Sequence, residues 1–549
     1  MGPLRIPRIT TLLAGTALLS ATLAGCAGAS HGAADSPSGS PTSNLLPTTP
    51  AAKGSLASLT WSLYAEPQSL DYTQAYDYPP STVLANVCEQ LLRVTPDMKI
   101  EPGLAVKSAN PDPLTWVYTL RDGVRFHDGA TMTADDVVAS LQRHLDPDAG
   151  SVWGPTFKNV TSITASGPLE VTIKLSKPDN LLNEMLAASP GTVESAAFLA
   201  KAGKTYGNPQ SGVDCTGPFA LDKWTQGDSI TLKKNPAYWD PALIPKTESV
   251  KFVFTQDPAA RTNAFLAGSV DGGYLLPSSS LAQLKAGSQG KVYFGPNTAA
   301  ADLAVVDFKG TLGDLKVRQA LSMALDRPSL IKAAVGGVGV PAKAPSPQGA
   351  WDLVPEKTAG YFAALPDPVF DLAGAKKLVQ DAGATGKKVT IATSTLSPDI
   401  SVVANAVQAA GKQIGLDVQL KAVAPDAYTT LFVDPGARAG LDLIITNGYD
   451  NTPDPLEFYQ TLQTGDSGNY GSYSNPAYDA LVDQANAAAD PAARAELTSK
   501  LQQLAVQELP VIPLYETPYS LFLSSRVTGA PTGIAQLYYP WAATIGSAN

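Results

Sequence analysis

The chain has 549 residues, of which 44% are hydrophobic, 16% charged and 7% aromatic, an ordinary composition for globular protein. Its 49 acidic residues outnumber its 39 Lys and Arg residues, and the formal net charge is −10 at pH 7. No run of Lys or Arg offsets this balance. The composition therefore argues against binding to nucleic acid or to an anionic membrane surface.

The first residues have the composition of an export signal. Two arginines precede a largely apolar stretch over 11–23, and the sequence Leu-Ala-Gly-Cys follows at 23–26. This pattern matches a bacterial lipoprotein signal, so we predict a signal peptide over 1–25 and lipid attachment at Cys26. An ordinary secretory signal with an incidental cysteine is the alternative. No later stretch is apolar and long enough to span a membrane, so a lipid anchor would be the only attachment.

Residues 26–55 are dominated by Ala, Gly, Ser, Thr and Pro. Such a segment cannot bury enough apolar surface to fold, and we predict a disordered tether there. The remaining part, 56–549, is long enough for two to four domains.

Cysteine usage fits an exported protein. Apart from Cys26, the chain contains Cys88 and Cys215, an even pair. We predict a disulfide between them, because oxidising compartments permit one, and two buried free thiols are the alternative. Cys and His residues do not cluster along the sequence, so we expect no zinc site, no other metal and no cofactor.

Periodicity and capping residues predict several elements. In the first half, strands are expected over 59–64 and 116–120, a helix over 81–92, and another helix with Thr133 as its cap and Asp136 in its first turn. In the second half, helices and strands alternate, which is typical of an α/β sheet. The predicted helices there cover 372–381 and 402–414, and the predicted strands cover 389–392, 418–420 and 441–446.

The continuous apolar run at 441–446 predicts a strand that is buried on both faces. The run stops at Asn447 and Gly448, and two prolines follow, so we predict that a loop starts there. In open α/β sheets ligands bind just beyond the carboxyl ends of the strands. This loop is therefore the first place to look for ligand contacts.

Two aspartates occur in this loop. Asp454 is explained as the N-cap of a helix with Pro455 at its first position and Glu457 at its third. Asp450 has no such local role, and its structural alternative is an Asx turn with Thr452. Asp450 is thus the first candidate for a ligand contact.

Enzyme-like motifs are incomplete. The sequence Gly-Asp-Ser-Gly at 465–468 is similar to a serine-protease nucleophile loop, but none of the three histidines, His31, His127 and His144, is placed to serve as its base. The glycines at 336–339 lack the spacing of a phosphate-binding loop. We therefore expect a binding protein without catalytic residues.

A more specific pattern lies at 121–137, which reads RDGVRFHDG at 121–129 and TADDV at 133–137. It resembles the signature of bacterial extracellular solute-binding proteins of family 5, the dipeptide-, oligopeptide- and nickel-binding receptors of ABC importers. Similar stretches follow one another in the family's order over nearly all of 56–549. They are 66–71, 89–105, 216–239 and 317–327.

The resemblance implies an α/β fold of the two-lobed periplasmic-binding-protein type (class II, cluster C), with an extra small subdomain in lobe I. The ligand would be enclosed between the lobes. Transferred to this chain, lobe I covers 56–297 and 516–549, with the subdomain at about 93–195, and lobe II covers 298–515.

The resemblance also implies a substrate-binding lipoprotein that captures a dipeptide or oligopeptide and delivers it to an ABC permease and its ATPase subunits. We expect an exported monomer, anchored by lipid on the outer face of the cell membrane (the periplasmic side where an outer membrane is present), without a nucleic-acid partner. The alternatives are a receptor of this fold for an oligosaccharide, an opine or a metal chelate, and a sensor lipoprotein that does not transport.

In the family's peptide receptors, an Asp in the loop after a lobe II strand pairs with the ligand's α-ammonium, and Asp450 occupies that place here. The family often has Trp shortly before this Asp. This chain has Asn447, Gly448 and Tyr449 there, so Tyr449 is expected to replace Trp as the stacking wall. Asn447 and Asn451 flank these residues and complete the expected lobe II side.

Other contacts are expected from position. Residues 65–68 would face the ligand from lobe I, which includes Glu66 and Pro67, although Pro67 cannot donate a backbone hydrogen bond. Trp351 follows a lobe II loop that could reach the ligand, and a packing role in the core or hinge is the alternative. We find no partner for a ligand carboxylate, and we interpret Arg438 as a solvated loop charge.

Overall fold

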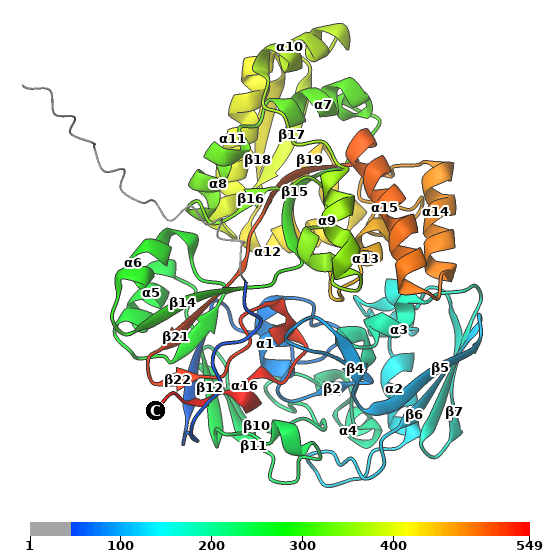
Figure 1. Ribbon diagram of the computed structural model, residues 1–549, viewed down its shortest axis with the longest axis vertical. Coiled ribbons are helices and arrows are strands. Elements are labelled where there is room, and N and C mark those ends of the chain that lie inside the picture. Colours follow the sequence, from blue (N-terminus) through cyan, green and yellow to red (C-terminus); the bar gives the residue numbers. More distant parts are fainter. Residues whose placement is uncertain (1–44) are drawn as a thin grey trace, which may run out of the picture. The chain divides into compact units, whose positions relative to one another are not determined.

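Two mixed β-sheets organise the part of the chain that this computed structural model describes, which is residues 45–549 without the side chains of residues 398 and 426 (Figure 1). The first sheet has seven strands in the order β10-β11-β12-β1-β13-β21-β14. The second has six in the order β16-β20-β15-β19-β17-β18. We call the parts of the chain built on these sheets lobe I and lobe II.

Lobe I takes its strands from separate stretches of the chain. At the centre, β1 runs parallel to β12 on one side and to β13 on the other. The strands are β1 (Leu59–Leu63), β10 (Phe219–Thr225), β11 (Ser229–Lys234), β12 (Ser249–Phe254), β13 (Gly272–Tyr274), β14 (Gly290–Gly295) and β21 (Tyr519–Ser524). Trp61 of β1 is fully buried against Tyr274 and Trp541, with ring centroids 5.1 and 4.5 Å away, and these rings form the centre of the core.

Helix α1 (Tyr78–Leu84) starts earlier and ends earlier than the helix predicted over 81–92. Asp77 caps it, because the backbone N–H of Tyr78 donates to Asp77 Oδ1 at 2.7 Å. The helix does not extend to residue 92, because Glu89 and Gln90 form strand β2 (Glu89–Gln90), which pairs with β9 (Thr192–Val193). Cys88 is joined to Cys215 by a disulfide, with the Cα atoms 4.8 Å apart.

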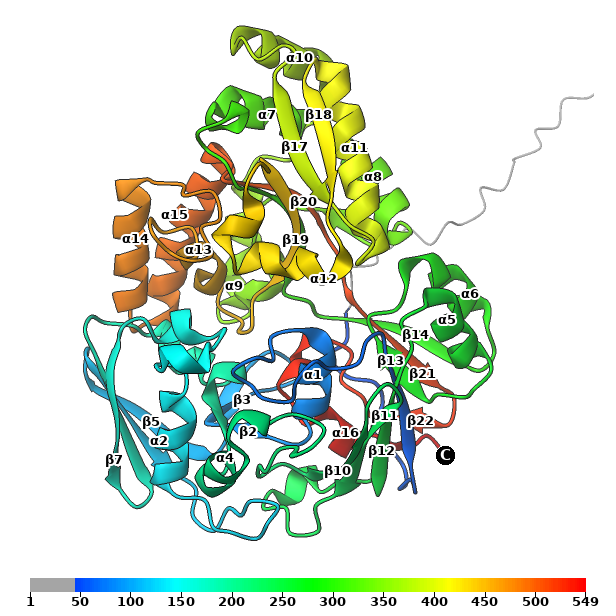
Figure 2. The same cartoon turned by 180° about the vertical axis from the view of Figure 1, so that it is seen from behind.

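A four-stranded antiparallel sheet forms a subdomain of lobe I with its own apolar core (Figure 2). Its strands, in the order β5-β6-β8-β7, are β5 (Ala105–Asp112), β6 (Thr115–Leu120), β7 (Val160–Gly167) and β8 (Glu170–Leu175). Helix α2 (Ala134–Gln142) packs against this sheet and begins after the predicted cap: the backbone N–H of Thr133 donates to Asp136 Oδ2 at 2.9 Å.

In lobe II helices and strands alternate, as predicted for the second half of the chain. The strands are β15 (Ala299–Val305), β16 (Val340–Pro341), β17 (Lys388–Thr393), β18 (Asp417–Ala422), β19 (Leu443–Tyr449) and β20 (Val511–Glu516). The longer helices are α7 (Leu315–Met323), α8 (Arg327–Val335), α9 (Pro355–Ala363), α10 (Leu372–Asp381), α11 (Pro398–Ile414), α14 (Pro476–Ala487) and α15 (Pro491–Glu508). Helix α10 coincides with the predicted 372–381, and β17 and β18 contain the predicted strands 389–392 and 418–420.

The chain passes between the two sheets along neighbouring segments (Figure 1). One runs from β14 in lobe I to β15 in lobe II, and the other returns from β20 to β21. These segments are antiparallel neighbours on both sides of the crossing, because β14 pairs with β21 and β15 pairs with β20. Between them, Asn297 Nδ2 donates to the carbonyl oxygen of Thr517 at 2.9 Å. Two adjacent connections of this kind can act as a hinge.

Residues 46–56 form an N-terminal strap on lobe I. The backbone N–H of Thr49 donates to Ala530 O at 2.9 Å, and that of Lys53 donates to Ser547 O at 2.9 Å. The prediction of disorder up to residue 55 is therefore wrong for this last part, because the C-terminal segment supplies hydrogen-bond partners that composition does not reveal. The predicted signal peptide, Cys26 and the first part of the tether lie outside the described residues. From residue 45 onward, no helix combines the length and apolarity of a membrane span.

Candidate ligand-binding site

Strand β19 places the candidate site. It lies between antiparallel β15 and parallel β17, and its residues 443–445 are buried, as expected of a strand covered on both faces. The strand does not stop at residue 446. Asn447, Gly448 and Tyr449 pair with the first residues of β15, so the loop begins only at Asp450. The prediction placed this boundary too early. Asn447 and Gly448 favour a turn by themselves, but pairing with β15 keeps their backbone extended.

Asp450 is 3% exposed and is the first residue after β19. Ser346 Oγ donates to its Oδ2 at 2.8 Å, and Thr298 Oγ1 donates to its carbonyl oxygen at 2.6 Å. Burial, and then the nearby Glu457 carboxylate, raise the pKa of Asp450 well above its usual value. The groups of the described chain that hydrogen-bond to its carboxylate are neutral, namely the Ser346 hydroxyl and the backbone N–H of Phe458. The carboxylate is therefore poised to gain stabilisation from a cation.

The Asx turn considered for Asp450 is not formed. The backbone N–H groups of Asn451 and Thr452 donate instead to Glu457 Oε2, at 2.8 and 3.1 Å. Glu457 lies in helix α13 (Leu456–Gln460), and burial raises its pKa to about 7. Sequence reasoning assigned Glu457 a capping role only, whereas the structure makes it a second carboxylate beside Asp450.

Tyr449 and Asn451 connect lobe II with lobe I. The Tyr449 hydroxyl donates to the carbonyl oxygen of Tyr76 at 2.8 Å, and its ring centroid lies 5.1 Å from that of Tyr78. Asn451 Oδ1 accepts a hydrogen bond from the hydroxyl of Tyr538, near the end of lobe I. Both residues therefore lie where the lobes meet. The ring contact with Tyr78 gives Tyr449 an aromatic neighbour from the opposite lobe.

Helix α13 begins one residue later than predicted, with Pro455 and not Asp454 as its N-cap residue, but Asp454 still contacts the start of the helix. The backbone N–H of Leu456 donates to its Oδ1 at 2.9 Å, while its Oδ2 accepts from Arg494 Nε at 2.5 Å. Arg494, in α15, also pairs with Glu184 of the subdomain. Asp454 thus pairs with the guanidinium of Arg494 and differs in this respect from Asp450.

The remaining predicted residues are not brought together with Asp450. Asn447 is exposed and donates from Nδ2 to Asp399 Oδ2 at 2.9 Å. Glu66 is held within lobe I, because it accepts from Trp224 Nε1 at 2.8 Å and from the backbone of Gly227 at 3.0 Å. The adjacent residue, Pro67, is buried.

Two lobe II residues have packing roles. Trp351 is fully buried against Tyr361, with ring centroids 5.2 Å apart, so the core alternative holds for it. Arg438 is not the solvated charge that we expected. It is 9% exposed, donates to Leu431 O at 2.6 Å and lies 5.0 Å from the Tyr470 ring, because the short 310 helix that carries it folds back on lobe II.

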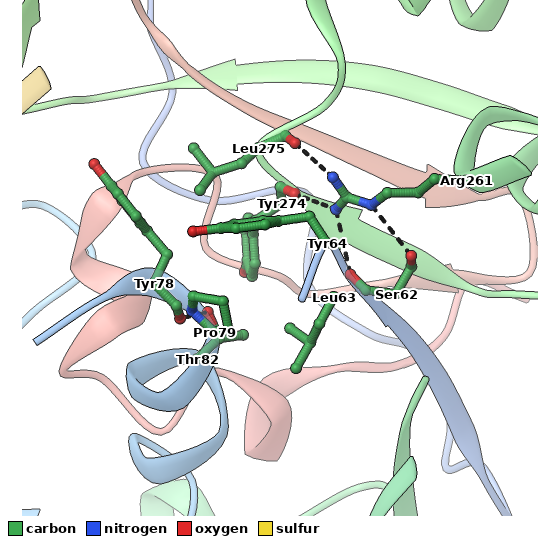
Figure 3. A pocket seen from close by; sticks show the side chains of 9 residues that line it. All are labelled: Ser62, Leu63, Tyr64, Tyr78, Pro79, Thr82, Arg261, Tyr274 and Leu275. Atoms are coloured by element: carbon green, nitrogen blue, oxygen red, sulfur yellow. Dashed lines mark hydrogen bonds between the residues drawn. The ribbon is translucent and has the colours of Figure 1, made fainter. Parts of the chain in front are cut away.

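A small cavity of about 10 Å³, the size of one water molecule, lies in lobe I beneath Tyr64 and Tyr78 (Figure 3). Its polar wall is Arg261, which is 2% exposed. The guanidinium donates to the carbonyl oxygens of Tyr274 and Leu275 at 2.5 and 2.7 Å and to both oxygens of Ser62. Burial lowers the pKa of Arg261 to about 10. Its donors hold three segments of lobe I together and are not turned toward Asp450.

The comparison with protein families agrees with this architecture. The model of bacterial extracellular solute-binding proteins, family 5 (middle region), matches residues 99–470, which is more than half of the chain. The chain belongs to this family. Its members bind solutes, and a solute-binding role is therefore the established part of the function of this family 5 protein.

Named relatives extend over most of the chain. The periplasmic murein peptide-binding protein MppA of Escherichia coli K12 is 26% identical over 498 residues, which cover 85% of this chain and 89% of MppA. Among solved structures, Helicobacter pylori DppA with the peptide STSA has a TM-score of 0.78 and 22% identity, covering 90% of this chain and 99% of DppA. AgaA of A. tumefaciens R10, in complex with agropinic acid, has a TM-score of 0.76 and 23% identity, covering 90% of this chain and 99% of AgaA. These structures share the two-lobed fold with this chain.

Proposed function

We propose that this family 5 protein is the binding component of an ABC importer, and that it captures a dipeptide or oligopeptide whose N-terminal ammonium pairs with Asp450. The observation that carries the proposal is the Asp450 carboxylate, which is buried at the end of β19 and accepts hydrogen bonds only from neutral donors among the described residues. A peptide ammonium would supply the missing charge. The ammonium in turn needs a carboxylate when it is buried, because an unpaired buried charge costs several kcal/mol.

The relatives support a peptide as the ligand. MppA is named for a murein peptide, and the DppA structure contains a peptide. AgaA has the same fold and holds agropinic acid, so the fold alone does not select a peptide. The case for a peptide therefore depends on the carboxylate at Asp450.

Capture would occur by closure of the lobes. Tyr449 and Asn451 of lobe II already contact lobe I, through Tyr76 and Tyr538. A ligand that contacts both lobes favours the closed form in proportion to the extra contacts it makes there. The neighbouring crossings at β14–β15 and β20–β21 provide the hinge for this motion.

Export and anchoring complete the proposal. The lipoprotein-like signal at 1–25 and Cys26 support attachment through acyl chains on the outer face of the cell membrane. A disulfide between Cys88 and Cys215 is compatible with such a compartment. Anchoring would keep the protein close to its permease.

Thermal shift and calorimetric titration test the ligand. We expect trialanine to raise the melting temperature and N-acetyl-trialanine to have no effect, because acetylation removes the ammonium charge. An oligosaccharide, an opine and Ni²⁺ complete the panel. If acetylated and free peptides bind equally well, the ammonium pairing is wrong.

The substitution Asp450→Asn tests the residue. It should weaken peptide binding by about 2 kcal/mol or more, at least about 30-fold, because the ammonium would be buried without a countercharge. Asp417→Asn is the matched control, since Asp417 is exposed on the edge strand β18, and it should bind like the unmodified protein. Equal affinity of Asp450→Asn and the control would exclude Asp450 as the partner.

A further inference from the structure

Two more carboxylates lie on the lobe II sheet near the candidate site. Asp302 is on β15, and Glu516 is the last residue of β20. In the register of these strands Glu516 is opposite Ala300, two residues before Asp302, so both carboxylates rise from the same face of the sheet. Their charges act on each other, because Glu516 contributes to raising the pKa of Asp302.

Asp302 is 1% exposed, and its Oδ1 has no hydrogen-bond partner in the described part of the chain. Burial is the main cause that raises its pKa well above the usual value. A buried acceptor without a donor costs about 1–3 kcal/mol, so this carboxylate is a second group that would gain from a positive charge.

One loop of lobe II connects these carboxylates with Asp450. Ser346 donates to Asp450, and two residues later the backbone N–H of Gln348 donates weakly to Glu516 Oε2 at 3.4 Å. Burial raises the pKa of Glu516 to about 7, and its side chain is only partly buried. Glu516 is therefore the more accessible carboxylate of this pair, since Asp302 is almost completely buried.

Three buried arginines of the described chain, Arg327, Arg261 and Arg494, already donate hydrogen bonds to other groups. Arg327 acts on Asp302 but donates to the carbonyl oxygens of Pro513 and Ser322, at 2.7 and 3.0 Å. Arg261 donates to backbone carbonyls of lobe I, and Arg494 is shared by Asp454 and Glu184. No three acidic, His or Cys side chains in the described residues are placed to hold a metal ion.

We propose that this site selects ligands with a net positive charge, with Asp450 taking the N-terminal ammonium and the Glu516–Asp302 pair taking a second cation. The substrate class would be peptides with a basic side chain. The assignment of a peptide as the ligand rests on the proposed function. The preference for positive charge is argued from the carboxylates alone. It also implies that the C-terminal carboxylate of the peptide has no basic partner among the described residues around the site.

Calorimetric titration of the full-length protein with three tripeptides tests the charge preference. We expect Lys-Ala-Lys to bind at least 10-fold more tightly than trialanine, and Glu-Ala-Glu to give no measurable heat. Trialanine amide should bind at least as tightly as trialanine. The inference is overturned if trialanine binds as tightly as Lys-Ala-Lys, or if amidation weakens binding.

Glu516→Gln and Asp302→Asn assign the preference to these residues. Each should reduce the ratio of Lys-Ala-Lys to trialanine affinity by at least 3-fold, and Asp417→Asn should leave the ratio unchanged. Glu516→Gln is the safer variant, because Glu516 is only partly buried, and a melting temperature within a few degrees of the unmodified protein verifies folding. An unchanged ratio in both variants would exclude the second cation position.

Two organic cations separate this inference from the proposed function. If no peptide binds but spermidine and agmatine do, with affinities lowered by Glu516→Gln, then the peptide assignment fails and the cation preference holds. If neither peptides nor these amines bind, the cation preference fails as well.

Discussion

At the scale of single residues, the candidate site concentrates carboxylates without cations to match them. Asp450 accepts from the Ser346 hydroxyl and the backbone N–H of Phe458, and the donors to Glu457 are neutral groups of Asn451 and Thr452. Both have a raised pKa, with burial as the first cause. The ligand-free site is therefore electrostatically unfavourable at neutral pH. Stability given up at a binding site in this way can be regained when the ligand binds.

The pH dependence of stability follows from this arrangement. The folded-state pKa of Glu457 is about 7, above its ordinary value near 4.5, so the folded protein holds the proton more tightly than the unfolded chain. Its contribution to stability is present below pH 4.5 and is lost as the pH rises through about 7. We expect the free energy of unfolding, measured with urea, to decrease between pH 5 and pH 7.5.

Glu457→Gln should make this decrease smaller, because the amide does not titrate. Glu356→Gln, in an exposed position of α9, serves as the matched control and should follow the unmodified protein. A decrease of the same size in Glu457→Gln and in the control would show that Glu457 does not titrate in this range.

The sequence predicted part of the candidate site. Asp450 and Tyr449 follow from a local pattern and a family resemblance, because both are adjacent to one predictable strand. Ser346, Glu516 and Asp302 were missed, since β15, β20 and the loop before Trp351 meet only in the folded sheet. Glu66 was assigned to the ligand by position alone, and nothing in its neighbourhood reveals that Trp224 and Gly227 hold it.

At the scale of elements, the predictions succeeded where one helix or strand carries its own signal. Helix α10 has a cap and an apolar stripe within its own residues, and its bounds were predicted. Strand β19 and helix α1 were misjudged at their ends, because β15 extends the first and the β2–β9 pairing shortens the second. Boundaries set by distant partners are beyond local patterns.

The disulfide is an element-scale constraint on lobe I. It joins Cys88, just after α1, to Cys215, across a separation of 127 residues, and so encloses the whole subdomain. Replacing both cysteines by serine should lower the unfolding free energy by about 2–5 kcal/mol, because the unfolded chain regains the freedom that the long loop removes. Urea unfolding of the double variant, with the oxidised protein as reference, measures the loss. A loss below about 1 kcal/mol would mean that the bridge adds little to stability.

At the scale of the whole molecule, the lobes make a second set of contacts between the subdomain and the part of lobe II that contains Asp466, α14 and α15. Lys158 pairs with Asp466 at 2.8 Å, and the backbone N–H of Asn180 donates to Asn486 O at 2.9 Å. Leu181 and Met185, in the short helix α3 (Leu181–Met185), belong to the apolar core of lobe II. The subdomain therefore takes part in holding the lobes together.

Arg494 joins this second contact to the candidate site. It pairs with Asp454 of its own lobe and with Glu184 of the subdomain, and its side chain is 2% exposed. Glu184→Gln removes the charge across the lobes while keeping a hydrogen-bond acceptor. We expect the closed form to lose about 1–2 kcal/mol, so that peptide affinity falls about 5- to 30-fold. Small-angle scattering should show a larger radius of gyration for the ligand-free variant.

Lys177→Met is the matched control for this prediction. Lys177 also pairs across the lobes, with Asp483 at 3.1 Å, but the two side chains are 51% and 54% exposed. Exposed pairs contribute about 0–1 kcal/mol, so the control should differ little from the unmodified protein in affinity and in radius of gyration. Identical behaviour of Glu184→Gln and Lys177→Met would contradict a special role for the buried pair.

The N-terminal strap has a consequence for how the protein would work at a surface. Residues 46–56 are bound to the C-terminal segment of lobe I, so the described chain begins its path on lobe I. If Cys26 carries the proposed lipid, we expect lobe I to be the lobe held near the membrane and lobe II to be the lobe that moves during closure. A fluorophore attached at Asn549 would then keep its distance from the membrane during capture. A fluorophore attached to lobe II would change that distance each time the lobes close.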